Sequence, residues 1–175
     1  GIIESRELFA YLEDKIEDIL ELKQRPLEKV IHRCASIKAR VVEKDERDDK
    51  DIRIALNFGH TLGHAIEAAA GYFRKYNHGD CVGIGMILAA EIAVKRDMLG
   101  ECDLDRIKAL VMGAELPTKI RGISVRDIID SYGYDKKFAT GSNRFVLPRR
   151  IGKVEVVEDI PGLLIKTVLR KYIEK

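Results

Sequence analysis

Apolar residues recur at three- and four-residue steps through most of this chain, which is the spacing of one face of an α-helix. The pattern predicts helices from Ser5 to about Leu22, Pro26 to Val41, Asn57 to about Tyr72, Val82 to Leu99, Asp103 to Met112 and Ser124 to Tyr132, with a last helix after Pro161. The segment from Val82 to Leu99 is apolar on nearly every side, which is typical of a buried helix.

The periodicity changes towards the end of the chain. Arg144–Pro148 and Lys153–Val157 have the composition of two short strands, and Ile151 and Gly152 lie between them as a turn. A chain of 175 residues is long enough for one domain with a full core. We therefore predict one mainly α domain over residues 1–175, a helical bundle with a small β-hairpin near the C-terminus.

Charge and composition narrow the range of partners. Thirty-one basic residues against 29 acidic ones leave a net charge of +2, so no global field attracts nucleic acid or an anionic membrane. The charged run Glu43–Asp51 is typical of a solvated helix end and loop. The three scattered cysteines include no CxxC pair, and no apolar run is long enough to span a bilayer. We expect a cytoplasmic protein.

Three of the four histidines lie close together in the sequence. On a helix, His60, His64 and Glu67 stand at i, i+4 and i+7 and share one face. Two imidazoles and a carboxylate form a zinc set that leaves one position open for a substrate. A histidine pair on a helix is more often an ordinary structural feature, and the sequence is not that of an HExxH metalloprotease helix. Spacing alone therefore leaves metal binding and a structural role both open.

Glycines are unusually frequent around these histidines. They are Gly59, Gly63, Gly79, Gly83 and Gly85. Each destabilises a helix by up to about 1 kcal/mol relative to alanine, so their presence needs a reason. We expect a ligand or another helix to approach the backbone closely here.

The longest motifs point to a known family. Leu56–Tyr72, LNFGHTLGHAIEAAAGY, and His78–Met86, HGDCVGIGM, closely resemble the LNxGHxxGHAIE and HGxAVxxGM signature of 3-dehydroquinate synthases. Lys38–Val42 with Asp45–Arg47 is similar to the family's KAxVVxxDERE, and Asp135–Lys137 is similar to its DKK. Four collinear motifs are far more specific than any one of them. The resemblance implies the C-terminal domain of a two-domain enzyme, whose N-terminal NAD-binding α/β domain is absent from this chain.

The resemblance also implies a metal set. It makes His60 and His78 ligands of zinc or another divalent cation, and it places the family's third ligand, a glutamate in an AEVIK-like segment, upstream of Gly1. Glu4 lies too far along the chain to match that motif. We therefore expect the isolated chain to bind zinc weakly and to be inactive alone, with NAD bound mainly by the absent domain.

The family's substrate is a sugar-acid phosphate, 3-deoxy-D-arabino-heptulosonate 7-phosphate, which is converted to 3-dehydroquinate and phosphate. By resemblance, the substrate-binding residues are Lys38, Arg53, Asn57, His64 and Lys136. Lys38, Asn57 and His64 are also implied to be catalytic, and His64 is a substrate contact rather than a metal ligand. On local grounds, Asn57 could equally be a plain helix N-cap. Family members are commonly homodimers.

Some residues depart from the family pattern. The segment Asp48–Arg53 is one residue longer than usual, and Asp80 and Cys81 replace the commoner glutamate and alanine. Cys81 is a conceivable thiolate ligand three residues from His78, although a small buried apolar role is favoured. The alternative functions are a related sugar phosphate cyclase, a metal-dependent polyol dehydrogenase or a non-catalytic helical module.

Overall fold

The structure is a computed structural model that describes residues 1–47, 52–71, 76–132 and 143–174. Its helices are α1 (Arg6–Leu20), α2 (Gln24–Lys44), the 3-10 helix η1 (Arg53–Asn57), α3 (His60–Ala70), α4 (His78–Lys95), α5 (Glu101–Gly113), α6 (Val125–Ser131) and α8 (Gly162–Tyr172). Its strands are β1 (Ile120–Arg121), β2 (Arg144–Arg150), β3 (Lys153–Glu158) and β4 (Ile173–Glu174). The mainly α fold with a hairpin near the C-terminus, predicted from the sequence, is confirmed.

The strands form two small sheets. β2 and β3 pair antiparallel as the predicted hairpin, in which Phe145 lies opposite Val157. β1 and β4 pair in parallel, with Ile120 opposite Ile173. The β1–β4 pair was not predicted, because two-residue strands leave no periodicity to detect. It ties the last described residues of the chain to the segment that follows α5.

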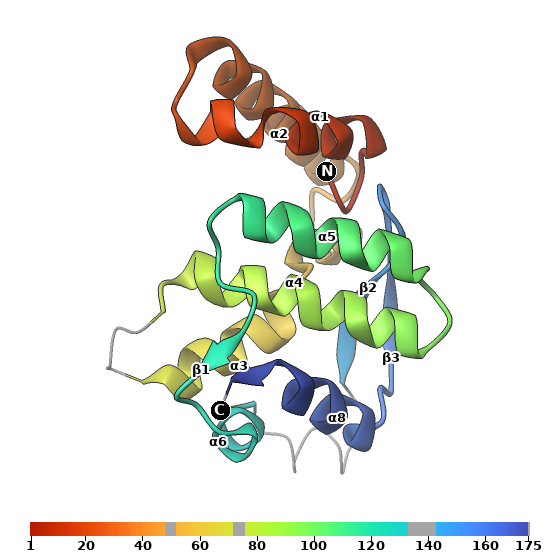
Figure 1. Ribbon diagram of the computed structural model, residues 1–175. Helices are drawn as coiled ribbons and strands as arrows, with labels where there is room; N and C mark the ends of the chain where they lie inside the picture. Colours follow the sequence, from red (N-terminus) through yellow and green to blue (C-terminus); the bar gives the residue numbers. More distant parts are fainter. Residues whose placement is uncertain (48–51, 72–75, 133–142, 175) are drawn as a thin grey trace.

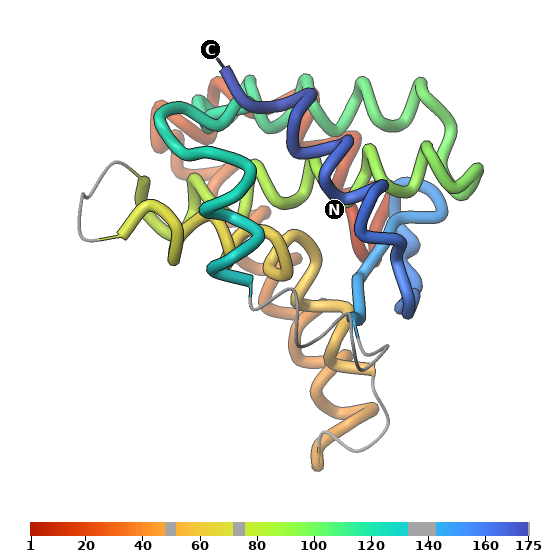
Figure 2. The backbone as a smooth tube through the Cα atoms, turned by 90° about the horizontal axis from the view of Figure 1, so that it is seen from below, coloured from red at the N-terminus to blue at the C-terminus, as the bar shows by residue number. Residues whose placement is uncertain are grey.

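The core is built around α4. This helix runs through the middle of the molecule, with α5 on one side, α3 and α8 on the other and the β2–β3 hairpin at one end (Figure 1). Its side chains are buried continuously from Cys81 to Gly85 and from Ile87 to Ala93, which confirms the predicted buried helix. Viewed from below, α8 and α6 cover the lower face, and the end of α2 projects beyond the body (Figure 2). None of the described helices combines the length and apolar character needed to cross a membrane.

Two predicted helix starts are wrong. The helix predicted from Asn57 begins at His60, because the 3-10 helix ends at Asn57 with Phe58 as its C-cap, and Gly59, at φ +83°, occupies the N-cap position of α3. Asn57 is therefore the last residue of η1, and its reading as the N-cap is wrong. The helix predicted from Val82 begins at His78, where the Asn77 side chain accepts a hydrogen bond from the Asp80 N–H. The polar first turn hid this start from a search for apolar periodicity.

At Gly59, Gly63 and Gly85 the expected close approach is made by another helix, whereas Gly79 and Gly83 meet only side chains. A Cβ at Gly63 would lie 3.0 Å from the carbonyl oxygen of Cys81, and a Cβ at Gly85 would collide with the carbonyl oxygen of Gly59. The backbones of α3 and α4 thus touch where both helices begin, without intervening side chains. This contact fixes the two histidine-bearing helix ends relative to one another.

A buried carboxylate joins α4 to the C-terminal helix. Glu91 is 1% exposed and accepts hydrogen bonds of 2.6 Å from the Lys171 ammonium and the Tyr172 hydroxyl. The Lys108 ammonium lies 3.6 Å away. Burial by itself favours the neutral acid, but the hydrogen bonds from Lys171 and Tyr172 and the nearby positive charges outweigh it and lower the pKa of Glu91.

We expect this carboxylate to make the fold sensitive to acid. Because the pKa of Glu91 is lower in the folded chain than in the unfolded chain, its contribution is fully present above the ordinary carboxyl pKa of about 4.3. That contribution is lost as the pH falls through the lowered folded-state pKa. Glu91→Gln should reduce the free energy of unfolding by roughly 1–3 kcal/mol at pH 7 and flatten its fall with acid.

Urea unfolding between pH 7 and pH 3 measures both effects. Glu17→Gln, an exposed carboxylate on α1, is the matched control and should leave the profile nearly unchanged. If the Glu91→Gln profile matched that of Glu17→Gln, the buried network would contribute nothing to stability.

Candidate metal centre

Three imidazoles converge where α3 and α4 begin. His60 is the first residue of α3, His64 follows one turn later, and His78 is the first residue of α4. Their ring centroids are 5.3 Å (His60–His64), 5.5 Å (His60–His78) and 5.6 Å (His64–His78) apart. One ligand nitrogen from each ring lies within 4.8 Å of the others. His78 lies on a different helix from His60 and His64, yet the fold brings it to the same point.

The geometry of this cluster suits a divalent cation. Zinc–imidazole bonds of about 2.0–2.1 Å in a tetrahedral site place ligand nitrogens about 3.4 Å apart. The ligand nitrogens already lie within 4.8 Å of one another, so modest ring rotations would bring them to bonding positions. His60 is half-buried, whereas His64 and His78 are exposed, so the cluster is open on one side. An open side leaves room for a substrate or a further ligand.

The Glu67 carboxylate lies beside a different histidine from the two that its spacing in the sequence indicates. Glu67 does not complete a set with His60 and His64; its carboxylate lies 3.0 Å from Nδ1 of His78. Nδ1 of His60 lies 3.3 Å from the carbonyl oxygen of Phe58. An Nδ1 proton donated to each of these oxygens leaves Nε2 of His60 and of His78 free to bind a metal, and it holds the rings in orientation. The carboxylate is therefore a support for a ligand.

The other predicted substrate-binding residues that the structure describes lie on η1 and α2. Arg53, half-buried, begins η1, and Asn57, exposed, ends it, three residues before His60. Lys38 is exposed on α2, which packs against η1. Lys136 lies outside the described residues.

The buried carboxylate of Asp45 holds the start of η1 against the end of α2. Asp45, 0% exposed, accepts hydrogen bonds from the backbone N–H groups of Ile52 (2.9 Å) and Arg53 (3.3 Å). It is thus an exception to the solvated character predicted for the run Glu43–Asp51. Its bonds tie the end of α2 to the beginning of η1, and so support the segment that carries Arg53 and Asn57 to the histidines.

A cavity of about 460 Å³ adjoins the cluster and shares His64 with it. Its other lining residues are Thr61, Ala65, Ala68, Ser131, Tyr132 and Arg144. Arg144 supplies a positive charge, and its guanidinium lies 3.2 Å from the Glu158 carboxylate. This cavity could not be predicted from the sequence, because its polar lining residues come from α3, from the end of α6 and from β2. A ligand bound at the cluster has room to extend into it.

Cys81 is a core residue. Its side chain is 0% exposed. Burial, with the nearby Glu67 and Asp80 carboxylates, raises the pKa of the thiol to about 11. A buried thiol that resists ionisation is a poor metal ligand, so the small apolar role favoured by the sequence agrees with the structure.

Comparisons with known proteins agree with this architecture. A family model described as "3-dehydroquinate synthase C-terminal" matches residues 1–138. The 3-dehydroquinate synthase of Desulforamulus reducens is 44% identical over 170 residues, which are 97% of this chain and 47% of the relative. That of Nostoc punctiforme is 40% identical over 173 residues, again 97% of this chain and 47% of the relative. The chain spans about half the length of the curated relatives it matches.

Solved structures share the fold. The 2-epi-5-epi-valiolone synthase of Streptomyces hygroscopicus, solved with NAD⁺ and Zn²⁺ bound, superposes with a TM-score of 0.84 at 23% identity, covering 98% of this chain and 48% of that chain. A 2-deoxy-scyllo-inosose synthase complexed with carbaglucose-6-phosphate, NAD⁺ and Co²⁺ gives a TM-score of 0.70 at 28% identity, covering 83% of this chain and 41% of that chain.

Proposed function

The chain belongs to the 3-dehydroquinate synthase C-terminal family, and from that premise we propose that it is the metal- and substrate-binding half of a 3-dehydroquinate synthase. The reaction converts 3-deoxy-D-arabino-heptulosonate 7-phosphate to 3-dehydroquinate and phosphate, by NAD-assisted oxidation, β-elimination, reduction and intramolecular aldol closure. It belongs to the shikimate pathway. NAD binds mainly to the other half of the enzyme, which functions as a homodimer in the cytoplasm.

The observation that carries this proposal is the convergence of His60 and His78, with His64 beside them, next to a cavity that Arg144 lines. The curated relatives support the choice of reaction, because those named above are called 3-dehydroquinate synthase at 40% identity or more. The neighbours solved with NAD⁺ and Zn²⁺ or Co²⁺ support the choice of cofactors. None of the three cysteines, Cys34, Cys81 and Cys102, forms a disulfide bond, which suits a reducing compartment.

The residues of this chain divide the task. His60 and His78 would hold a divalent cation, which would supply Lewis acidity for the oxidation and elimination steps. Glu67 keeps the His78 ring turned towards that position. His64 donates a hydrogen bond near the leaving phosphate, at the border between cluster and cavity.

The positive charge that binds the substrate is concentrated at the site. The chain has a net charge of only +2, so an anionic substrate must be held by cations gathered at the site. Arg53 suits bidentate binding of a carboxylate or phosphate, and Asn57 supplies an amide for the substrate hydroxyls. Lys38 and Lys136 complete the predicted set.

A chimera tests the function. This chain, joined to the N-terminal half of the Desulforamulus reducens relative, should release phosphate from the heptulosonate phosphate and form 3-dehydroquinate in the presence of NAD⁺ and Zn²⁺. The chain alone should not. Glucose 6-phosphate, offered in parallel, separates the related cyclases, whose inosose-forming member was solved with a carba analogue of it. A folded chimera that consumed glucose 6-phosphate and left the heptulosonate phosphate unchanged would refute the assignment.

A further inference from the structure

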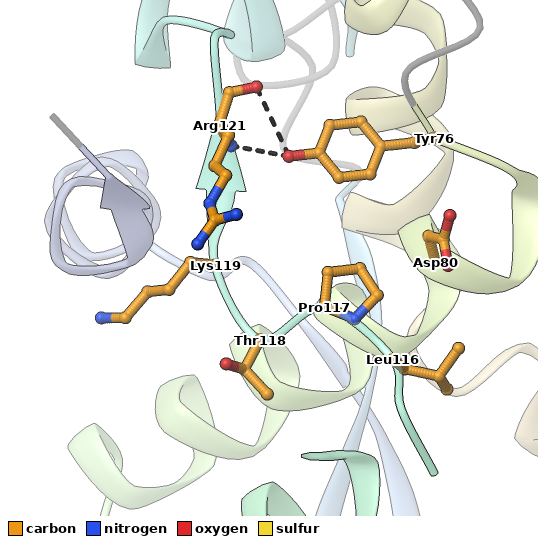
Figure 3. Close-up of a pocket in the computed structure, with 7 residues that line it drawn as sticks. All are labelled: Tyr76, Asp80, Leu116, Pro117, Thr118, Lys119 and Arg121. Atoms are coloured by element: carbon orange, nitrogen blue, oxygen red, sulfur yellow. Dashed lines mark hydrogen bonds between the residues drawn. The ribbon is translucent and has the colours of Figure 1, made fainter.

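Tyr76 makes an unusual connection just before the metal cluster. Its hydroxyl accepts a hydrogen bond of 2.6 Å from the backbone N–H of Arg121 and donates one of 3.4 Å to the carbonyl oxygen of the same residue (Figure 3). The N–H and C=O of one strand residue point to the same side, so a single hydroxyl can serve both. Tyr76 thereby attaches the segment before α4 to β1, which lies 45 residues further along the chain.

Only Asn77 separates Tyr76 from His78. Asn77 caps α4, and a reciprocal bond of 3.0 Å joins its backbone N–H to the Asp80 carboxylate. The His78 backbone is thus held between a side-chain anchor on one side and a capping box on the other. Glu67 orients the ring of His78, and the α3–α4 backbone contact sets the distance between the two helices. The Tyr76 anchor adds a third restraint, on the segment that enters α4.

The anchor point is itself well supported. Ile120 is 0% exposed, and β1 pairs in parallel with β4, where Arg121 lies opposite Glu174. The Arg121 guanidinium also binds the Glu174 carboxylate. Both of those side chains are exposed, so solvent screens this ion pair, and its contribution is small. The buried strand and its backbone pairing therefore provide the support.

The surroundings of the Tyr76 side chain allow the role of its hydroxyl group to be tested separately from the packing of its ring. The ring packs against the main core, and it forms one wall of a pocket of about 480 Å³ that Asp80 and Lys119 also line (Figure 3). Asp80 follows His78 by two residues and so faces away from it on the helix. This pocket is therefore not part of the histidine cluster. Tyr76→Phe therefore removes the hydroxyl group, which lies beside this pocket, and retains the packing contacts of the ring.

We propose that Tyr76 is a positioning residue for the metal centre, through which the strand pair β1–β4 holds His78 in place. The inference rests on the proposed metal site. It adds that the affinity of His60 and His78 for a cation depends on a bond to Arg121 and on a C-terminal strand about 100 residues away from the cluster in sequence. Neither element bears a metal ligand.

Titration of the chain with ZnCl₂ and with CoCl₂ tests this. Tyr76→Phe should weaken binding of both ions about tenfold, the lower end of the effect of outer-shell partners. It should also alter the visible absorption of the Co²⁺-saturated chain, because the geometry around the cation relaxes. A role in stability alone would leave the saturated spectrum unchanged. Tyr11→Phe on α1 removes a hydroxyl away from the cluster and should change neither quantity.

A second measurement uses the unaltered chain, so its result does not depend on whether a variant folds. Zn²⁺ should slow hydrogen exchange of the Arg121 amide, since coupling between the two positions acts in both directions. If the parent chain binds Zn²⁺ while Tyr76→Phe matches its affinity and its Co²⁺ spectrum, or if Zn²⁺ leaves Arg121 exchange unchanged, the positioning role is refuted. Failure of both the parent chain and the chimera to bind either ion would refute the metal site itself.

Discussion

Gly85→Ala will destabilise the chain by about 3 kcal/mol or more, at the upper end of the effect of overpacking a core. A Cβ at this position collides with the carbonyl oxygen of Gly59 and lies 2.9 Å from the backbone nitrogen of Gly63. Both obstacles are backbone atoms of the adjoining segment, so no side-chain rotation relieves the contact. Relief requires α3 to move away from α4.

That movement also affects the site. His60 begins α3 and His78 begins α4, so separating the two helices separates the two proposed ligands. Gly85→Ala should therefore reduce zinc affinity together with stability. Urea unfolding and zinc titration on the same preparation measure both quantities.

Gly113→Ala is the matched control, because Gly113 is also helical and its added Cβ would meet only the Ile16 side chain, at an ordinary 3.5 Å. Its stability should be unchanged or raised by up to about 1 kcal/mol, since alanine restricts the unfolded chain more than glycine does. Equal losses of stability in the two variants would show that glycine flexibility, and not the α3–α4 contact, matters at Gly85.

The helices could be predicted because their packing leaves a periodic trace in the sequence. α4 is the clearest case, since a helix that is buried on all sides has almost no polar residues over its length. Helix starts were harder to predict, because they depend on capping and backbone conformation. Gly59 at φ +83° and the Asn77 cap decide where α3 and α4 begin, and neither changes the apolar period.

Residue spacing in the sequence predicted only part of the candidate site. The spacing of His60 and His64 predicts that they share a helix face, which they do, but it assigns Glu67 to the wrong role. The carboxylate pairs with His78, which is 11 residues away and on another helix, so only the fold reveals the contact. Motif resemblance linked His60 with His78 where spacing could not. Arg144 and Tyr76 carry no motif, and their contacts depend on tertiary packing alone.

His78→Ala will weaken zinc binding at least about 100-fold, because loss of even an outer-shell partner weakens metal binding 10–100-fold. His60→Ala should have a similar effect, since both imidazoles have their Nδ1 atoms next to oxygens and each contributes a ligand nitrogen to the same cluster. Calorimetric titration of each variant with ZnCl₂ measures the change. Thermal unfolding should show that both variants remain folded, because neither ring is buried in the core.

His64 decides between two arrangements of the cluster. Geometry brings one nitrogen from each of the three imidazoles within 4.8 Å of the others, whereas family resemblance makes His64 a contact to the substrate. Because His64 also lines the 460 Å³ cavity, we expect His64→Ala to leave zinc affinity within a few-fold of the parent and to lower turnover by the chimera. A loss of zinc affinity as large as that of His78→Ala would instead make His64 a third ligand. Hydrogen bonding to the leaving phosphate would then have to come from another residue of the cavity.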